Sequence, residues 1–108
     1  MKQTKDDRNP YGWLIPLHVL HHAAEEPLYG RWMIAELRRH GYEIGPGTMY
    51  RLLHRLAREG YLLRKQQRSD SRYRKVYQIT PSGRLALNLA RRRVKVSFGE
   101  IFSRRLNS

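Results

Sequence analysis

The side chains best suited to chemistry in this chain lie between positions 50 and 58. Tyr50, Arg51, His54, Arg55 and Arg58 recur at spacings that place them on one face of a helix. The opposite face is an apolar stripe made of Met49, Leu52, Leu53 and Leu56. Arginine forms bidentate hydrogen bonds with guanine, and the N-terminus of a helix suits phosphate. We therefore expect Arg51, His54 and Arg55 to contact nucleic acid, with Arg58 as a solvated or backbone-facing charge.

A second basic element follows this helix directly. Residues 61–67 and 73–79 are rich in aromatic and aliphatic side chains and predict a β-hairpin with its turn over 68–72. One acid, Asp70, stands against six cations, which are Arg64, Lys65, Arg68, Arg72, Arg74 and Lys75. A basic helix that leads into a basic hairpin is the order of elements in a winged helix-turn-helix.

The hairpin would then be the wing, and we expect it to supply affinity more than sequence choice. Its Ser69-Asp70-Ser71 turn reads as flexible and is poorly suited to rigid base recognition. Clustered cations neutralise phosphates whatever the base sequence. The predicted phosphate contacts of the wing are Arg68, Arg72, Arg74 and Lys75.

The remaining elements must position the basic helix and the basic hairpin. Apolar residues at helical spacing predict a first helix over 13–24 and a second over 29–40, which Gly41 closes. Thr80 as N-cap and Pro81 in the first turn open a last helix. The predicted fold class is mainly α with a small β-hairpin. The predicted organisation is a flexible N-terminal tail over 1–10, a winged helix-turn-helix DNA-binding domain over 11–80, and a C-terminal dimerisation helix and tail over 81–108.

The last helix carries an apolar stripe that one small core cannot cover. Its members recur at spacings of three, four, four and three, and they are Leu87, Ala90, Val94, Phe98 and Ile101. Part of the stripe can fold back on the first helix of the same chain, at Trp13, Leu17 and Leu20. Unpaired stripes of this length usually mark interfaces. We therefore predict a homodimer through this helix, with Trp13 and Leu17 at the same surface.

Composition favours a nucleic-acid partner. Among 108 residues there are 22 Lys and Arg against 9 Asp and Glu, which gives a formal net charge of +13. The chain has no cysteine, which excludes a disulfide framework or thiolate zinc site. No apolar run approaches the roughly 20 residues of a membrane span, and residues 1–10 lack the apolar core of a signal peptide. We expect a soluble, cytoplasmic protein without a membrane partner.

Three histidines offer a different chemistry. His18, His21 and His22 share a face of the first helix, with Glu25 nearby, so an imidazole metal site is geometrically feasible. A histidine-based metal sensor is therefore a remote alternative. No HExxH spacing or distant ligand set accompanies these residues, and we assign no metal ligand or cofactor. No Ser-His-Asp set, phosphate-binding loop or paired carboxylate site is recognisable, so we do not expect an enzyme.

From about Leu14 onward the chain resembles the PadR family of bacterial transcriptional regulators. The motifs that carry the resemblance are Pro27-Leu28-Tyr29-Gly30, Pro46-Gly47-Thr48-Met49-Tyr50, Leu53-His54-Arg55-Leu56 with Glu59-Gly60, and Tyr77-Gln78-Ile79-Thr80-Pro81-Ser82-Gly83. The resemblance implies a winged-helix dimer that binds a palindromic operator and usually represses transcription, with a ligand that releases DNA in some members. The short segment after the wing resembles the smaller type, which has a single C-terminal helix. The resemblance also adds Gly47, Thr48 and Tyr50 to the expected DNA contacts, at phosphates and base edges.

Two positions depart from the family pattern. Arg51 replaces a common proline and adds a cation to the expected DNA face, and Arg31 replaces a common aromatic residue beside Trp32. For Tyr50, a half-buried packing role is as well supported as a DNA contact. A sequence-independent nucleic-acid-binding or architectural protein is the main alternative function, because a charge of +13 binds any phosphate backbone. A small-molecule inducer stays unidentified; an interface pocket for one would use Trp13, Trp32, Phe98 and Phe102.

Overall fold

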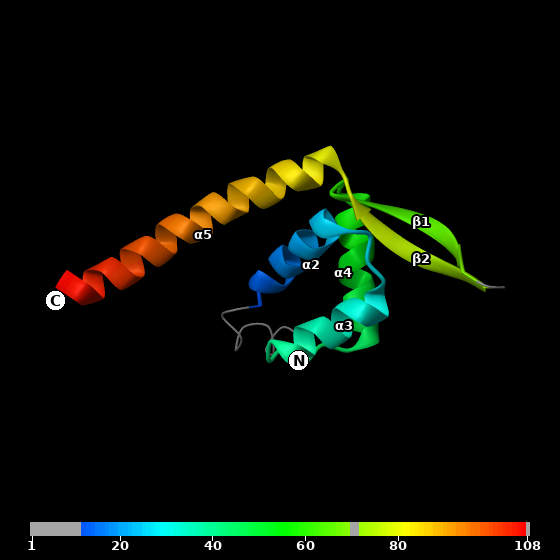
Figure 1. Cartoon of the computed structure of the whole chain (residues 1–108), viewed down its shortest axis with the longest axis horizontal. Helices are drawn as coiled ribbons and strands as arrows, with labels where there is room; N and C mark the ends of the chain where they lie inside the picture. Colours follow the sequence, from blue (N-terminus) through cyan, green and yellow to red (C-terminus); the bar gives the residue numbers. More distant parts are fainter. Residues whose placement is uncertain (1–11, 70–71, 108) are drawn as a thin grey trace.

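The computed structural model describes residues 12–69 and 72–107, without the side chains of residues 69 and 103–107 (Figure 1). The predicted tail over 1–10 and the centre of the wing turn, residues 70 and 71, lie outside the described part. In chain order the elements are α2 (Leu14–Glu25), α3 (Gly30–Arg39), α4 (Pro46–Arg58), β1 (Leu62–Ser69), β2 (Arg72–Ile79) and α5 (Pro81–Asn107).

The core lies where α2, α3, α4 and the base of the hairpin meet. Each helix contributes the apolar side of its periodic pattern, and the fully buried side chains are Val19, Met33, Leu37, Met49, Leu53 and Tyr77. Gly41 has a φ of +90°, which a residue with a side chain rarely adopts, and it ends α3 so that the chain can turn into α4. Pro46 begins α4 at a position where its missing N–H costs nothing.

The hairpin is a two-stranded antiparallel sheet that projects from this core (Figure 1). Leu28 joins its base through an isolated bridge, in which the amides of Leu28 and Tyr77 each donate to the carbonyl oxygen of the other at 3.0 and 2.9 Å. Toward the tip, all described side chains from Leu63 to Arg68 and from Arg72 to Lys75 are exposed. The wing is therefore fixed at its base and solvated along its length.

The strands run farther than the sequence predicted. Arg68 pairs with Tyr73, and Ser69 pairs with Arg72, so the ladder extends into the segment assigned to the turn. The guanidinium of Arg68 also lies over the Tyr73 ring, 5.7 Å from its centroid. Continued backbone pairing and this cation–π contact explain why the predicted five-residue turn over 68–72 was too long.

Helix α5 starts as predicted and then leaves the core. The Thr80 hydroxyl accepts a hydrogen bond from the Gly83 amide at 3.0 Å, which caps the helix. A Cβ on Gly83 would collide with the carbonyl oxygen of Tyr61, so glycine is required for this close approach. Leu87 is buried, and the N-terminal half of α5 packs against α2, while the C-terminal half extends past the other helices (Figure 1).

The predicted fold class is confirmed: the described chain is mainly helical with one small β-hairpin in winged helix-turn-helix order. The division at residue 80 into a DNA-binding domain and a dimerisation helix stays a prediction. Among the helices that the structure describes, none combines the length and apolar character needed to cross a bilayer.

Candidate nucleic-acid interface

The outer face of α4 is open to solvent along its length. Thr48, Arg51, His54, Arg55 and Arg58 are all exposed, as their spacing predicted. The guanidinium of Arg51 donates to the Thr48 hydroxyl at 3.4 Å. The two side chains therefore occupy one site at the first turn of the helix, where its partial positive charge favours phosphate.

Gly47 leaves room at this same turn. It is exposed, and a Cβ built there would meet only the Arg51 guanidinium, at 3.7 Å. A bare backbone beside a cation at a helix N-terminus lets a phosphate approach the amides closely. This geometry supplies a physical reason for the predicted phosphate contact at Gly47, which stays a prediction.

Tyr50 is both packed against a neighbouring helix and partly exposed, so its side chain fits both of the roles considered from the sequence, packing and DNA contact. It is 38% exposed, but its ring lies against α3, because a Cβ on Gly30 would come within 2.6 Å of the ring carbon Cε1. The ring therefore helps to hold α3 against α4, and the exposed remainder faces solvent. Gly30 is small for this reason.

A contact that the sequence analysis did not predict joins α4 to the wing. The guanidinium of Arg64 on β1 donates to Nε2 of His54 at 3.2 Å. Arginine has no acceptor, so His54 must carry its proton on Nδ1 in this arrangement. Arg64 thus extends the basic surface from α4 into the hairpin. The contact could not be predicted from the sequence, because His54 and Arg64 are ten residues apart on two different elements.

Arg64 also lies near a buried hydroxyl. Burial is the main cause that raises the pKa of Tyr77, and the Arg64 guanidinium acts in the opposite direction. Within the described residues, the Tyr77 hydroxyl has no hydrogen-bond partner of acceptable geometry. The phenol, which is neutral at physiological pH even without this shift, adds no charge to the surface above it.

The wing cations differ in how firmly they are held. Arg74 lies over the ring of Tyr29, 5.3 Å from its centroid, and the Tyr29 hydroxyl donates to Gln67 at 3.0 Å. Tyr29 therefore attaches both strands of the wing to the α2–α3 connection. Arg72 and Lys75 are exposed on the same hairpin. This role of Tyr29 was not predicted from the sequence, although Tyr29 lies in one of the recognised motifs.

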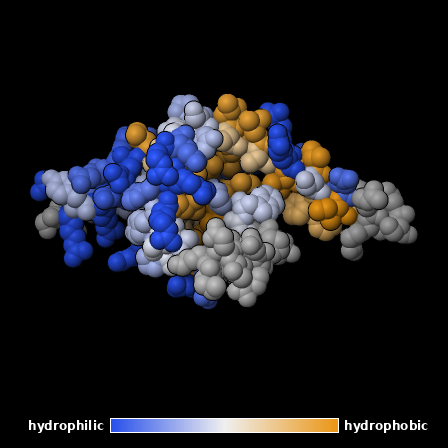
Figure 2. All heavy atoms as spheres, turned by 180° about the vertical axis from the view of Figure 1, so that it is seen from behind, coloured by the Kyte–Doolittle hydropathy of each residue, from blue (hydrophilic) through white to orange (hydrophobic). Residues whose placement is uncertain are grey.

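The α4–wing surface and α5 differ in how much exposed apolar side chain they carry. Every buried side chain among the described residues is apolar or Tyr77, so the described cations all lie at least partly at the surface. Figure 2 shows hydrophilic side chains over the wing end of the molecule, and hydrophobic side chains interspersed with hydrophilic ones along α5. The exposed large apolar side chains of α5 thus lie apart from the cations of α4 and the wing, although α5 also carries exposed cations of its own, such as Arg93.

The predicted dimerisation residues fall into two groups. Leu87 is only 2% exposed and belongs to the core of its own chain, and Leu17, Ala90 and Val94 are half-buried. The exposed members, each above half exposure, are Trp13, Phe98 and Ile101. The rings of Phe98 and Phe102 also pair, with centroids 5.3 Å apart. Intramolecular packing thus takes the first half of the stripe and leaves the second half uncovered.

Helix α5 has a second apolar face that the sequence analysis overlooked. Leu85, Leu89 and Val96 are spaced by four and seven residues, so they share a side that differs from the Leu87 side. All three are exposed. The single-stripe pattern missed them because a helix with apolar residues on two sides gives no clear period.

The histidines form a cluster across α2 and α3. His18 stacks on His40, with ring centroids 5.4 Å apart, and Nε2 of His22 lies 3.8 Å from the carboxylate of Glu36. Burial lowers the pKa of both His18 and His22, and neighbouring imidazoles lower it further. The pKa of Glu36 is lowered mainly by its hydrogen bond from Arg39. At neutral pH the His18 and His22 rings are therefore uncharged beside an ionised carboxylate.

These features define a winged-helix protein with an exposed basic face on α4 and a basic wing. Residues 19–89 match the model of the transcriptional regulator PadR-like family, and the chain belongs to this family. It is 50% identical over 78 residues to the transcriptional regulator Rv3488 of Mycobacterium tuberculosis, which covers 72% of this chain and 73% of that protein.

Solved structures agree with this assignment. The chain is similar to a PadR family transcriptional regulator from Eggerthella lenta, with 28% identity, a TM-score of 0.73, and coverage of 83% of this chain and 80% of that one. The fold also matches Bacillus subtilis PadR in complex with operator DNA, with 18% identity and a TM-score of 0.62 over 69% of this chain and 45% of that chain. The family assignment made from the sequence motifs is confirmed.

Proposed function

We propose that this transcriptional regulator binds DNA sequence-specifically, as a homodimer on a palindromic operator, and acts as a repressor. The observation that carries the proposal is the continuous basic surface from α4 to the wing, joined by the contact between His54 and Arg64. An apolar stripe on the other side of α4 fixes the helix rigidly, so the exposed residues keep a defined geometry. The structure of the fold neighbour Bacillus subtilis PadR in complex with operator DNA supports DNA binding by a protein of this fold.

In this proposal α4 and the wing make different kinds of contact with DNA. Arg51 and Arg55 read base edges in the major groove, while Gly47 and Thr48 hold a phosphate at the start of α4. Tyr50 and His54 line the same face. The wing contributes phosphate contacts through Arg68, Arg72, Arg74 and Lys75, which favour any duplex.

The homodimer rests on α5. Trp13, Phe98 and Ile101 leave apolar surface in water, and Leu17, Ala90 and Val94 would complete the contact at its edge. Leu87 supports this surface from within the protomer. Two copies related by a two-fold axis would cover each other's exposed half and present two reading helices to the DNA.

The main alternative is a sequence-independent nucleic-acid-binding protein, which the net charge of +13 would also permit. Such a protein needs cations but no fixed reading face. The family gives no reason to expect an enzyme, and a protein acting on bacterial genes would work in the cytoplasm.

Selection of binding sites from fragmented genomic DNA tests the proposal directly. We expect enrichment of one palindromic sequence, with half-sites about 10 base pairs apart or a multiple of this. Affinity for that duplex should exceed affinity for a scrambled duplex by about 10³-fold or more at physiological salt. Recovery of fragments without a shared sequence would instead support the architectural alternative.

Repression and assembly need separate measurements. Sedimentation of the free protein at micromolar concentration should give twice the mass of one chain. Transcription from a promoter that contains the selected site should fall when the protein is added, and a rise would make it an activator. A monomeric free protein would contradict the proposed homodimer.

A further inference from the structure

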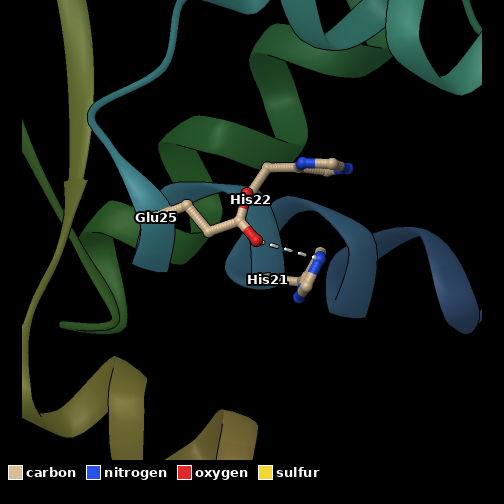
Figure 3. A group of neighbouring side chains, drawn as sticks. All are labelled: His21, His22 and Glu25. Carbon is tan, nitrogen blue, oxygen red and sulfur yellow. Dashed lines mark ion pairs between the residues drawn. The ribbon is translucent and has the colours of Figure 1, made fainter.

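Three side chains on α2 gather at one surface position. Figure 3 shows the Glu25 carboxylate pointing toward the His21 ring, and its Oε2 lies 3.6 Å from Nε2 of His21. One ligand atom from each of His21, His22 and Glu25 lies within 4.8 Å of the other two. Imidazole nitrogen and carboxylate oxygen are the ligands that divalent transition metals take in proteins. Two histidines with one glutamate leave a fourth position for water.

We propose that His21, His22 and Glu25 bind a divalent transition-metal ion of the Zn²⁺ or Ni²⁺ type. Bonds of about 2.0–2.1 Å place tetrahedral ligand atoms roughly 3.3 Å apart. Side-chain rotation can close the present separation, because the side chains of His21 and Glu25 are 44% and 65% exposed. Mg²⁺ and Ca²⁺ prefer oxygen ligands and would not be held by this set.

The surroundings of His22 suit such a site. His22 and Glu25 both line a pocket of about 500 Å³, which has room for a metal-bound water. Glu36 lies 3.8 Å from Nε2 of His22 and is itself fixed by two hydrogen bonds from Arg39 at 3.0 and 3.2 Å. Carboxylates that accept a hydrogen bond from a metal-bound imidazole orient its ring in many proteins, and a small side-chain movement would bring Glu36 into that role.

Arg91 links the proposed metal site on α2 to α5. Its guanidinium donates to Nδ1 of His21 at 2.9 Å, across 70 residues of sequence. A neutral imidazole has one lone pair and one N–H, and Arg91 occupies the lone pair. A metal ion bound to either ring nitrogen uses this lone pair. The other nitrogen then carries the proton and cannot accept a hydrogen bond from Arg91. Metal binding and the His21–Arg91 contact are therefore mutually exclusive, and metal would release Arg91 from α2.

Titration of the tag-free protein with Zn²⁺ alone, followed by calorimetry, tests the site without DNA. We expect one ion per chain in the wild-type protein and at least about 10-fold weaker binding in H21A, H22A and E25Q, since even outer-shell partners change metal affinity by about 10–100-fold. The control H54A removes a histidine on α4, away from the proposed site, and should bind Zn²⁺ as the wild type does. Circular dichroism checks that each variant is folded.

The variant R91A tests the competition. It should bind Zn²⁺ roughly 2- to 10-fold more tightly, the factor that corresponds to one net hydrogen bond. Ni²⁺ should also quench the fluorescence of Trp32, whose ring lies 5.2 Å from His22, in a W13F background. Zn²⁺ affinity that is equal in E25Q, H21A and the wild type would overturn the site, and weaker binding in R91A would overturn its link to α5.

Discussion

The α4–wing surface and the C-terminal half of α5 are both exposed, yet their chemistry is opposite. The first carries cations, several of them held by Thr48, His54 or Tyr29. The second carries bare apolar side chains such as Phe98 and Ile101, which are 56% and 57% exposed. Charged side chains are well hydrated and stable in water alone, whereas clustered apolar ones are not.

This difference separates two kinds of partner. A hydrated cationic face gains most from phosphates, whose condensed counterions it releases. An apolar helix face gains most from another apolar face, and a second copy of the same chain supplies one with matching geometry. Helix α5 contains the boundary between the core and the exposed apolar surface, because Leu87 is buried and Phe98 is exposed on one stripe. Substitutions along this stripe and along α4 can test the distinction.

The largest expected effect is on folding, at the buried end of α5. Leu87→Ala should lower the free energy of unfolding by about 2–5 kcal/mol, because it leaves a cavity against α2. Leu89→Ala, two residues away but exposed, should change it by less than about 0.5 kcal/mol apart from any effect on assembly. Urea unfolding of both variants at one protein concentration gives the comparison. Equal losses would mean that the two sides of α5 are not distinct.

At the exposed end, the expected effect is on assembly. Phe98→Asp should weaken dimer association by roughly 100-fold or more, since each dimer would bury two unpaired carboxylates. The conservative change Phe98→Leu should keep the dimer. Analytical ultracentrifugation over a concentration series measures both, and circular dichroism should find the monomeric variant still folded. A dimer that survives Phe98→Asp would place the interface elsewhere.

On α4, Arg51→Ala and Arg55→Ala should each cost about 1–3 kcal/mol of binding free energy on the selected operator if the arginines read bases. Losses on a scrambled duplex should be smaller. Arg93→Ala, which removes an exposed cation of α5, is the matched control and should change both affinities little. Titration by fluorescence anisotropy measures all three. Equal losses on the two duplexes would assign Arg51 and Arg55 to the DNA backbone.

The wing should respond mainly to salt. Arg72→Ala should reduce the slope of log affinity against log salt concentration by about 0.9 on operator and on scrambled duplex alike, because one phosphate contact is lost. Binding at four or five salt concentrations gives the slope. An unchanged slope with a lost preference for the operator would mean that the wing reads sequence, for example through the width of the minor groove.

The smallest effect concerns pH. The folded protein lowers the pKa of His18 and His22 below their ordinary value of 6.5, so the unfolded chain binds protons first as pH falls. Stability should therefore decrease from about pH 7.5 to pH 5.5. The variant H22Q should have a shallower decrease in thermal unfolding temperature over this range, and H54Q should follow the wild type.

Much of the fold follows from local patterns. The apolar positions of α4, the Gly41 and Thr80 caps and the aromatic hairpin each depend on residues a few positions apart, so the sequence predicts them well. The exposed face with Arg51, His54 and Arg55 follows from the same periodicity. Where apolar residues lie on two sides, as at Leu85, Leu89 and Val96, the pattern loses its period and the second face was missed.

The contacts that join these elements depend on packing between distant segments. The sequence determines that α4 and the wing are basic, because helical and strand periods are set by neighbouring residues. Only the tertiary structure brings Arg64 to His54, Arg74 to Tyr29 and Arg91 to His21. It also decides where along α5 the core ends, since that point depends on how far α2 extends beneath it. Such contacts span about 10 to 70 residues, and no local spacing records which partner a side chain will meet.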